Sequence, residues 1–182
     1  VSYTGNVAGI IWKGKNDGIA RAYGYRYDET SRLLHAEFNQ KLSGSSVWGK
    51  GAVDFTTSNI QYDGNGNLLS MKHMGLKGTS SSTVDQLSYT YKQQSNRLLS
   101  VADPYHNPLD GLGDFKDGTN PVTVPDYDYD ANGNIIQDLN KNIVAGGIKY
   151  NHLNLPQRIE ITGKGVIEYS YDANGARHRK KV

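Results

Sequence analysis

The chain has no cysteine among its 182 residues, and this absence excludes two classes of protein. Neither a scaffold held by disulfides nor a metal site built from thiolates is possible. No stretch is apolar over a length that could cross a membrane as a helix, and no segment has the pattern of a signal peptide. We therefore expect no membrane insertion.

The chain also has almost no excess of one charge over the other. The 20 Lys and Arg residues nearly balance the 18 Asp and Glu residues, which leaves a net charge of +2. Basic residues are dispersed except in the run Arg177-His178-Arg179-Lys180-Lys181. We interpret that run as a solvated strand end in preference to a contact for an anionic partner. Nothing in the pattern predicts a nucleic-acid partner.

The residue combinations of common catalytic and metal centres are missing too. No two of the five histidines stand three or four residues apart, so zinc and non-haem iron are unsupported: His35, His73, His106, His152 and His178. Asp114 and Asp117 could serve as acid and base in glycoside hydrolysis. They lie between glycines in a proline-rich stretch, however, and we interpret them as solvated loop acids. We expect neither an enzyme nor a cofactor.

One acidic segment has half of a calcium-loop pattern. Asp128-Tyr129-Asp130-Ala131-Asn132-Gly133 alternates oxygen ligands before a glycine, as calcium loops do. The bidentate carboxylate expected six residues after the glycine is Leu139 here. Because related segments of the chain have the same turn without the upstream acid, we favour a hairpin turn over a metal site.

What the chain does have is tyrosine in an internal repeat. Six times an aromatic residue or isoleucine stands two positions before a tyrosine, and the second position of each copy is residue 27, 62, 91, 129, 150 or 171. Such alternation predicts a strand with one buried face. We expect the tyrosines of each copy on one face and residues 26, 61, 90, 128, 149 and 170 on the other.

A turn follows each strand. In Asp63-Gly64-Asn65-Gly66 and its equivalents at 130–133 and 172–175, the carboxylate can cap its own turn and Asn-Gly supplies a positive φ. Outgoing strands are then predicted to begin at Leu33, Leu68, Leu98, Ile135 and Leu155. The sixth copy departs and reads Ala176-Arg177-His178, so we expect the chain to be a segment cut from a longer protein, inside a repeat.

Segments between the repeats vary in length. The last three repeat tyrosines follow one another at intervals of 21 residues, and the longer intervals between earlier repeats hold insertions at 43–46, 78–83 and 103–126. The last insertion contains four of the five prolines and is predicted to be the longest loop. Near the start, Ile11 and Trp12 are too apolar to be left in water, so we predict a strand there that pairs with 23–27. Helix content should be very low.

The tyrosines have two interpretations. Aromatic rings can stack on sugars, but Ile60 and Ile148 replace the first aromatic in two copies, which packing tolerates and a stacking site would not. We therefore favour packing in a sheet. On this view the ring stabilises each position and the hydroxyl contributes little.

These recurring residues resemble the signature of the RHS, or YD-repeat, family, in the form common in Bacteroides and its relatives. The residues that carry the structural repeat are Tyr25, Tyr27, Asp28, Tyr62, Asp63, Gly66, Tyr89, Tyr91, Tyr127, Tyr129, Asp130, Gly133, Tyr150, Tyr169, Tyr171, Asp172 and Gly175. The resemblance implies a spiralling β-sheet that forms a hollow shell, which in toxins encloses a toxic polypeptide. The self-cleaving core of that family has no counterpart here, so no cleavage activity is implied.

Together these observations predict an all-β chain, a curved antiparallel sheet of about ten to twelve strands in one repeat segment spanning 1–182. Its function would be structural and non-enzymatic, within a shell or stalk of a secreted or cell-surface bacterial protein. Its partner would be the remainder of that polypeptide, an RHS core or a toxin cargo. The alternative is an adhesion module that binds a glycan or surface protein through the tyrosine face or the 103–126 loop. Exposed sheet edges, above all at Tyr169–Tyr171, also predict self-association.

Overall fold

The computed structural model describes residues 5–41, 44, 46–51, 53–105, 114–118 and 124–182. Within them the protein is all-β, as predicted, with 14 strands and one short 3-10 turn, Leu139–Lys141. The described part of the chain contains no helix with the length and apolarity that a membrane span requires. The expectation of very low helix content is confirmed.

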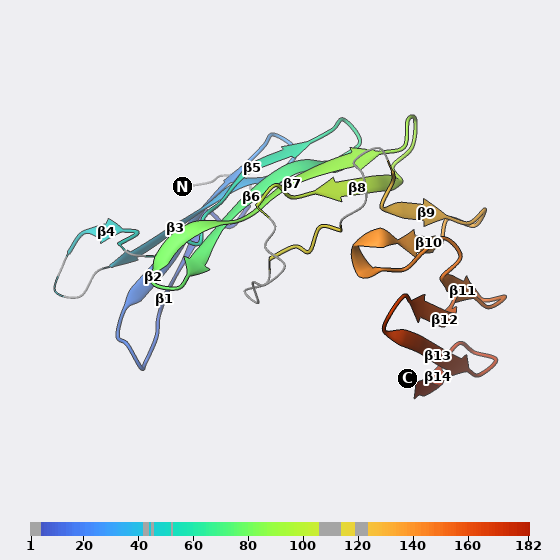
Figure 1. The fold of residues 1–182 in the computed structure, drawn as a ribbon. Helices are drawn as coiled ribbons and strands as arrows, with labels where there is room; N and C mark the ends of the chain where they lie inside the picture. The colour runs from blue at the N-terminus through green and yellow to red at the C-terminus, as the bar shows by residue number, and fades with distance from the viewer. Residues whose placement is uncertain (1–4, 42–43, 45, 52, 106–113, 119–123) are drawn as a thin grey trace. The chain divides into compact units, whose positions relative to one another are not determined.

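The first sheet has eight strands (Figure 1). Its path runs β1-β2-β3-β5-β6-β7-β8, with β4 paired to β3 beside this path. The strands are β1 (Gly9–Lys13), β2 (Ala20–Tyr27), β3 (Leu33–Lys41), β4 (Trp48–Gly49), β5 (Thr57–Tyr62), β6 (Leu68–Lys77), β7 (Ser80–Tyr91) and β8 (Leu98–Ala102).

Two smaller antiparallel sheets follow. One pairs β9 (Tyr127–Tyr129) with β10 (Ile135–Asp138), and the other runs β11 (Ile148–Tyr150), β12 (Pro156–Ile161), β13 (Gly165–Tyr171) and β14 (Arg177–Lys181). The single sheet of ten to twelve strands is therefore wrong for this chain, whose strands divide among three sheets. Both β9 and β11 have only three residues, and their pairings contain register shifts, so the hydrogen-bond ladder there is short.

The chain divides into two compact units. One comprises Val1–Tyr89 with Ala102–Phe115, and the other comprises Thr90–Val101 with Lys116–Val182. In the first unit the largest fully buried side chain is Phe38, whose ring makes edge-to-face contacts with Tyr23 and Phe55 at centroid distances of 5.5 and 5.2 Å. Val101 and Ile143 are the buried hydrophobic residues described in the second unit.

The strand predicted near the start exists, but its burial was predicted wrongly. The partner of β1 is β2, the strand that contains 23–27, as expected, but Ile11 and Trp12 lie opposite Ala22 and Arg21, before that range. All five residues of β1 are nevertheless exposed, and Ile11 retains 73% of its surface. Among the described strands β1 is an edge strand and pairs with β2 alone. Trp12 packs by stacking on Tyr23, with ring centroids 5.6 Å apart.

The alternation within the repeats is confirmed. In β2, β5, β7, β9, β11 and β13 the last tyrosine and the residue two positions before it are partly or fully buried, while the residue between them is exposed. Each motif thus presents its aromatic residues on one face of its strand. The polar residue between them faces solvent.

The predicted insertions have different outcomes. Within the insertion at 78–83, Ser80 to Thr83 are part of β7 and pair with Lys77 to Met74 of β6. Polar residues extend this hairpin because both strands satisfy each other's main-chain groups. Residues 103–105, 114–118 and 124–126 form no strand, as expected, and the rest of the 103–126 loop lies outside the described residues, as do 43 and 45.

The expected edge at Tyr169–Tyr171 is also wrong. These residues belong to β13, which lies between β12 and β14 and has strand partners on both sides. The segment Ala176-Arg177-His178, which departs from the repeat pattern, still leads into a strand. The edge strands of this sheet are therefore β11 and β14.

Candidate functional site

The repeated turn is a three-residue loop closed by main-chain hydrogen bonds. The N–H of Asp63 donates to the carbonyl of Asn67 at 2.9 Å, and the N–H of Gly66 donates to the carbonyl of Asp63 at 3.1 Å. Gly66 has a φ of 88°, which glycine adopts without a steric cost. Gly133 and Gly175 have φ values of 88° and 83°, so the predicted positive φ is confirmed and lies at the glycine of Asn-Gly.

The aspartate at the start of the turn caps it, as predicted. The Oδ1 atom of Asp63 accepts hydrogen bonds from the N–H groups of Asn65 and Asn67. The same two bonds, to the residues two and four positions later, occur in four other copies, at Asp28, Asp130, Asn151 and Asp172. Because Asn151 makes them with an amide oxygen, the turn requires an acceptor but no charge.

These hydrogen bonds favour the charged form of each carboxylate. The side-chain amide of Asn67 lowers the pKa of Asp63, and that of Asn134 lowers the pKa of Asp130. The main-chain N–H of Ala176 lowers the pKa of Asp172. At Asp28 desolvation opposes the shift, but hydrogen bonds from Arg32 and Thr30 outweigh it and lower the pKa to about 2.

The segment with half of a calcium pattern is one of these turns. Asp130 accepts from two N–H groups through Oδ1 and from the side-chain amide of Asn134 through Oδ2. Asp128 accepts from the N–H of Tyr129 at 2.8 Å. The carboxylates therefore serve the hairpin, which is the interpretation that the sequence favoured.

A second repeated contact joins neighbouring copies, and we call it the tyrosine ladder. The hydroxyl of the last tyrosine in a motif donates a hydrogen bond to a main-chain carbonyl. That carbonyl lies at the start of the outgoing strand that precedes the motif or, in the case of Val7, just before that strand. The distances between the two oxygens are 3.0 Å for Tyr27 to Val7, 2.9 Å for Tyr62 to Leu33, 2.9 Å for Tyr129 to Leu98, 2.8 Å for Tyr150 to Ile135 and 2.8 Å for Tyr171 to Pro156.

The tyrosine ladder was not predicted from the sequence. Its acceptors are main-chain carbonyls, which every residue type has, so no residue pattern marks them. Burial raises the pKa of both Tyr129 and Tyr150, so their hydroxyls remain protonated donors near neutral pH. The expectation that the hydroxyl contributes little did not include these hydrogen bonds, which give each of these hydroxyls an acceptor.

Side chains of one turn also reach the next copy. The guanidinium of Arg32 lies 4.7 Å from the centre of the Tyr62 ring and donates to the carbonyl of Asp63 at 3.2 Å. Arg97 lies over Tyr129 in the same way, at 5.5 Å. Two of the six turns thus place an arginine on the tyrosine of the following motif, where a cation–π contact is favourable.

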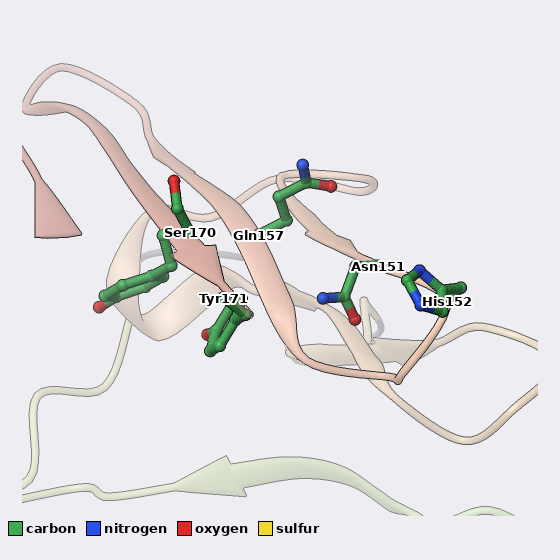
Figure 2. Close-up of a pocket in the computed structure, with 6 residues that line it drawn as sticks. Asn151, His152, Gln157, Ser170 and Tyr171 are labelled. Atoms are coloured by element: carbon green, nitrogen blue, oxygen red, sulfur yellow. The ribbon is translucent and has the colours of Figure 1, made fainter. Parts of the chain in front are cut away.

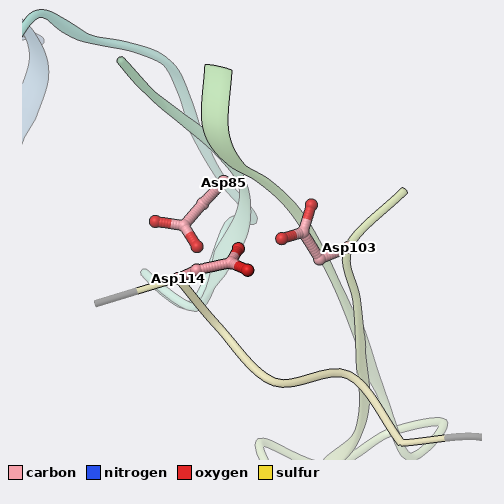
Figure 3. A group of neighbouring side chains, drawn as sticks. All are labelled: Asp85, Asp103 and Asp114. Carbon is pink, nitrogen blue, oxygen red and sulfur yellow. The ribbon is translucent and has the colours of Figure 1, made fainter. Parts of the chain in front are cut away.

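Three aspartates form a buried cluster in the first unit (Figure 3). Asp85 of β7, Asp103 and Asp114 are 7%, 4% and 5% exposed, and one carboxylate oxygen of each lies within 4.8 Å of the others. The interpretation of Asp114 as a solvated loop acid is therefore wrong, whereas Asp117 is partly exposed. No residue pattern indicated that β7 supplies a carboxylate beside this loop.

Main-chain donors hold two of these carboxylates. Asp85 accepts from the N–H of Phe115 at 2.7 Å, and Asp103 accepts from the N–H groups of Gln86 and Tyr105 at 3.0 Å. An all-oxygen donor set is the chemistry that a hard cation prefers. The observed bonds, however, give Asp85 and Asp103 a structural role, because they tie residues 103–105 and 115 to β7.

The second unit contains a hollow of about 400 Å³ (Figure 2). It is lined by Asn151, His152, Gln157, Tyr169, Ser170 and Tyr171. The two tyrosine rings are 6.4 Å apart and inclined by 46°, so they do not form a coplanar platform. Arg177 lies 5.3 Å from the centre of the Tyr169 ring, and the Tyr171 hydroxyl is used by the tyrosine ladder.

Comparison with known proteins adds no relative to these observations. No protein-family model matches the chain, and no curated protein matches it.

Proposed function

We propose that the chain is a non-enzymatic structural module whose hairpin repeats stack into part of a β-sheet shell or stalk. The tyrosine ladder is the observation that carries this proposal. Four of the five ladder bonds join one copy to the copy before it, and their acceptors are main-chain carbonyls. Such a contact can be repeated without constraining the exposed residues, which is what a wall of variable sequence requires.

The resemblance to the YD-repeat family supports the rest of the proposal. The module would belong to a large exported bacterial protein, secreted or at the cell surface, and its partner would be the rest of that polypeptide, an RHS core or a toxin cargo. Strands with one aromatic face and one polar face suit a wall that separates an enclosed space from solvent.

Electron cryo-microscopy of the complete gene product tests this proposal. We expect density in which the six hairpins form successive rungs of a curved wall. A matched variant in which Phe replaces Tyr62, Tyr129, Tyr150 and Tyr171 should be cleaved more readily by protease than the parent protein. Density in which these repeats form an isolated domain on a linker would contradict the proposal.

The hollow lined by the β11–β12 turn, β12 and β13 favours a second function, an adhesion module that binds glycan. Its lining combines two tyrosines with the amides of Asn151 and Gln157. A glycan array probed with the chain would test this, and replacing Gln157 and His152 with Ala should abolish any signal. Lys164→Ala, an exposed change in the β12–β13 turn, is the matched control. Absence of binding across the array would leave only the structural function.

A further inference from the structure

The edge strand β14 combines two properties that rarely occur together. Its sequence, Arg177-His178-Arg179-Lys180-Lys181, carries basic groups at every position, and all five residues are exposed. In the part of the chain that the structure describes, β13 is its only strand neighbour. The opposite edge therefore presents a row of main-chain donors and acceptors, which is a template for another strand.

The charges of β14 are only partly balanced within the fold. His178 lies 3.5 Å from Asp172, Lys181 lies 3.6 Å from Glu168, and Arg177 covers Tyr169. Among the described residues, no ion pair involves Arg179 or Lys180. Their cross-strand neighbours in β13 are Ser170 and Tyr169, neither of which is an acidic residue. Two adjacent cations, one on each face of the strand, thus remain for an outside partner.

Charge decides which strand fits this edge. A second β14 would place like charges opposite each other, which destabilises a strand pair. An apolar strand would leave both cations uncompensated. A strand with acidic residues would satisfy the main-chain edge and pair its carboxylates with Arg179 and Lys180.

We propose that β14 binds an acidic, extended polypeptide segment, which adds to this sheet as a fifth strand. Main-chain hydrogen bonds supply the affinity in this mode of recognition, and the cross-strand ion pairs select acidic sequences. The proposal goes beyond the structural function proposed above, and its test addresses the edge of β14 alone.

Fluorescence anisotropy with labelled peptides tests the proposal on the whole chain. The probe, called the Glu-Val peptide, is an end-capped repeat of Glu-Glu-Val-Val, which places carboxylates on both faces of a strand. The Lys-Val peptide, a repeat of Lys-Lys-Val-Val, has the opposite charge. A third peptide, the Glu-Pro peptide, is a repeat of Glu-Glu-Pro-Pro, so it keeps the charge but lacks the N–H groups of its prolines along both edges of a strand. We expect only the Glu-Val peptide to bind, with an affinity that decreases as salt is raised.

Two variants locate the contact. The double variant Arg179→Glu with Lys180→Glu should lose at least about five-fold in affinity for the acidic peptide and gain binding to the Lys-Val peptide. Lys164→Glu makes a single charge reversal in the exposed β12–β13 turn and should leave binding unchanged. If the double variant unfolds, as judged by circular dichroism, Lys180→Gln should still weaken binding about two-fold.

Three outcomes would overturn the proposal. Equal binding of the Glu-Pro peptide would show attraction to any polyanion, not strand addition. Undiminished binding by the double variant would place the contact elsewhere. Failure of the Glu-Val peptide to bind at low salt would show that the edge of β14 does not accept a strand.

Discussion

Each tyrosine of the ladder donates to a main-chain carbonyl. A side-chain substitution at the acceptor residue therefore does not remove the acceptor. The ring and the hydroxyl therefore contribute separately. The ring packs on one face of its strand, and in two copies it also lies under an arginine of the preceding turn. A hydrogen bond of this kind contributes about 0.5–1.5 kcal/mol net.

Tyr129 separates these two contributions. We expect Tyr129→Phe to lower the free energy of unfolding by about 1 kcal/mol, because it removes only the bond to Leu98. Tyr129→Ala should cost about 3 kcal/mol, the low end for a large aromatic residue, because the ring is only partly buried. Urea unfolding measures both values.

A control for Tyr129 is available in the same chain. Tyr105 is 47% exposed and lies outside the strands, so Tyr105→Phe should change stability by less than about 0.5 kcal/mol. If Tyr129→Phe is as harmless as Tyr105→Phe, the tyrosine ladder does not stabilise the fold.

The turn aspartates predict how stability depends on pH. Asp28 has a pKa of about 2 in the folded chain, against 3.8 as its ordinary value, and the pKa values of Asp63, Asp130 and Asp172 are also lowered. A lowered folded pKa gives stability that is present above pH 3.8 and is lost as pH falls toward 2. Unfolding free energies measured between pH 5 and pH 2 should decrease over this interval.

Asparagine at these four positions supplies the matched variant. Asn151 shows that an amide oxygen can cap the same turn. A chain with Asp28, Asp63, Asp130 and Asp172 all replaced by Asn should keep its strands and lose part of the decrease in stability between pH 4 and pH 2. If the unfolding free energy of this variant falls with pH as steeply as that of the parent chain, other carboxylates control acid unfolding.

At the scale of the element, glycine position matters more than glycine content. Gly66 has a positive φ and Gly64, in the same turn, does not. We expect Gly66→Ala to cost about 1–2 kcal/mol, because an L-residue is strained in that conformation. Gly64→Ala meets no atom within 4 Å and should be neutral or stabilise by about 0.4–1 kcal/mol. Thermal unfolding of both variants compares them, and equal losses would contradict this assignment of strain.

The hairpins were predictable from the sequence because their signals are local. Alternation places Tyr127 and Tyr129 on one face, and Asn-Gly places the turn, using residues within about ten positions of one another. Other features depend on distant parts of the chain. The acceptor of Tyr129 lies 31 residues away, and the burial of Asp114 depends on a loop that returns to β7. No local pattern contains that information.

The exposure of the first strand is another feature that local sequence patterns could not predict. Alternation cannot reveal that β1 lies at the edge of its sheet, so Ile11 and Trp12 appeared too apolar to remain in water. Their exposure, 73% and 38%, leaves an apolar strand edge. At the scale of the whole molecule this edge matters for association, since unpaired strand edges are templates for another chain.

We predict that the chain self-associates weakly through β1. Pairing there would cover Ile10, Ile11 and Trp12, and each large apolar side chain contributes about 1.5–3 kcal/mol when it becomes fully buried. Screening of the basic residues of β14 should strengthen the association modestly as salt is raised. Sedimentation velocity over a range of protein and salt concentrations measures this association.

The variant Ile11→Lys identifies the edge that associates. A charge at the centre of β1 should weaken association by about ten-fold or more, because burying it would cost more than the pairing returns. Val144→Lys makes the same kind of change at an exposed valine outside the strands and should have no effect. If both variants associate like the parent chain, the contact lies on another surface. If the parent chain stays monomeric at high protein and high salt, the apolar residues of β1 do not suffice for pairing.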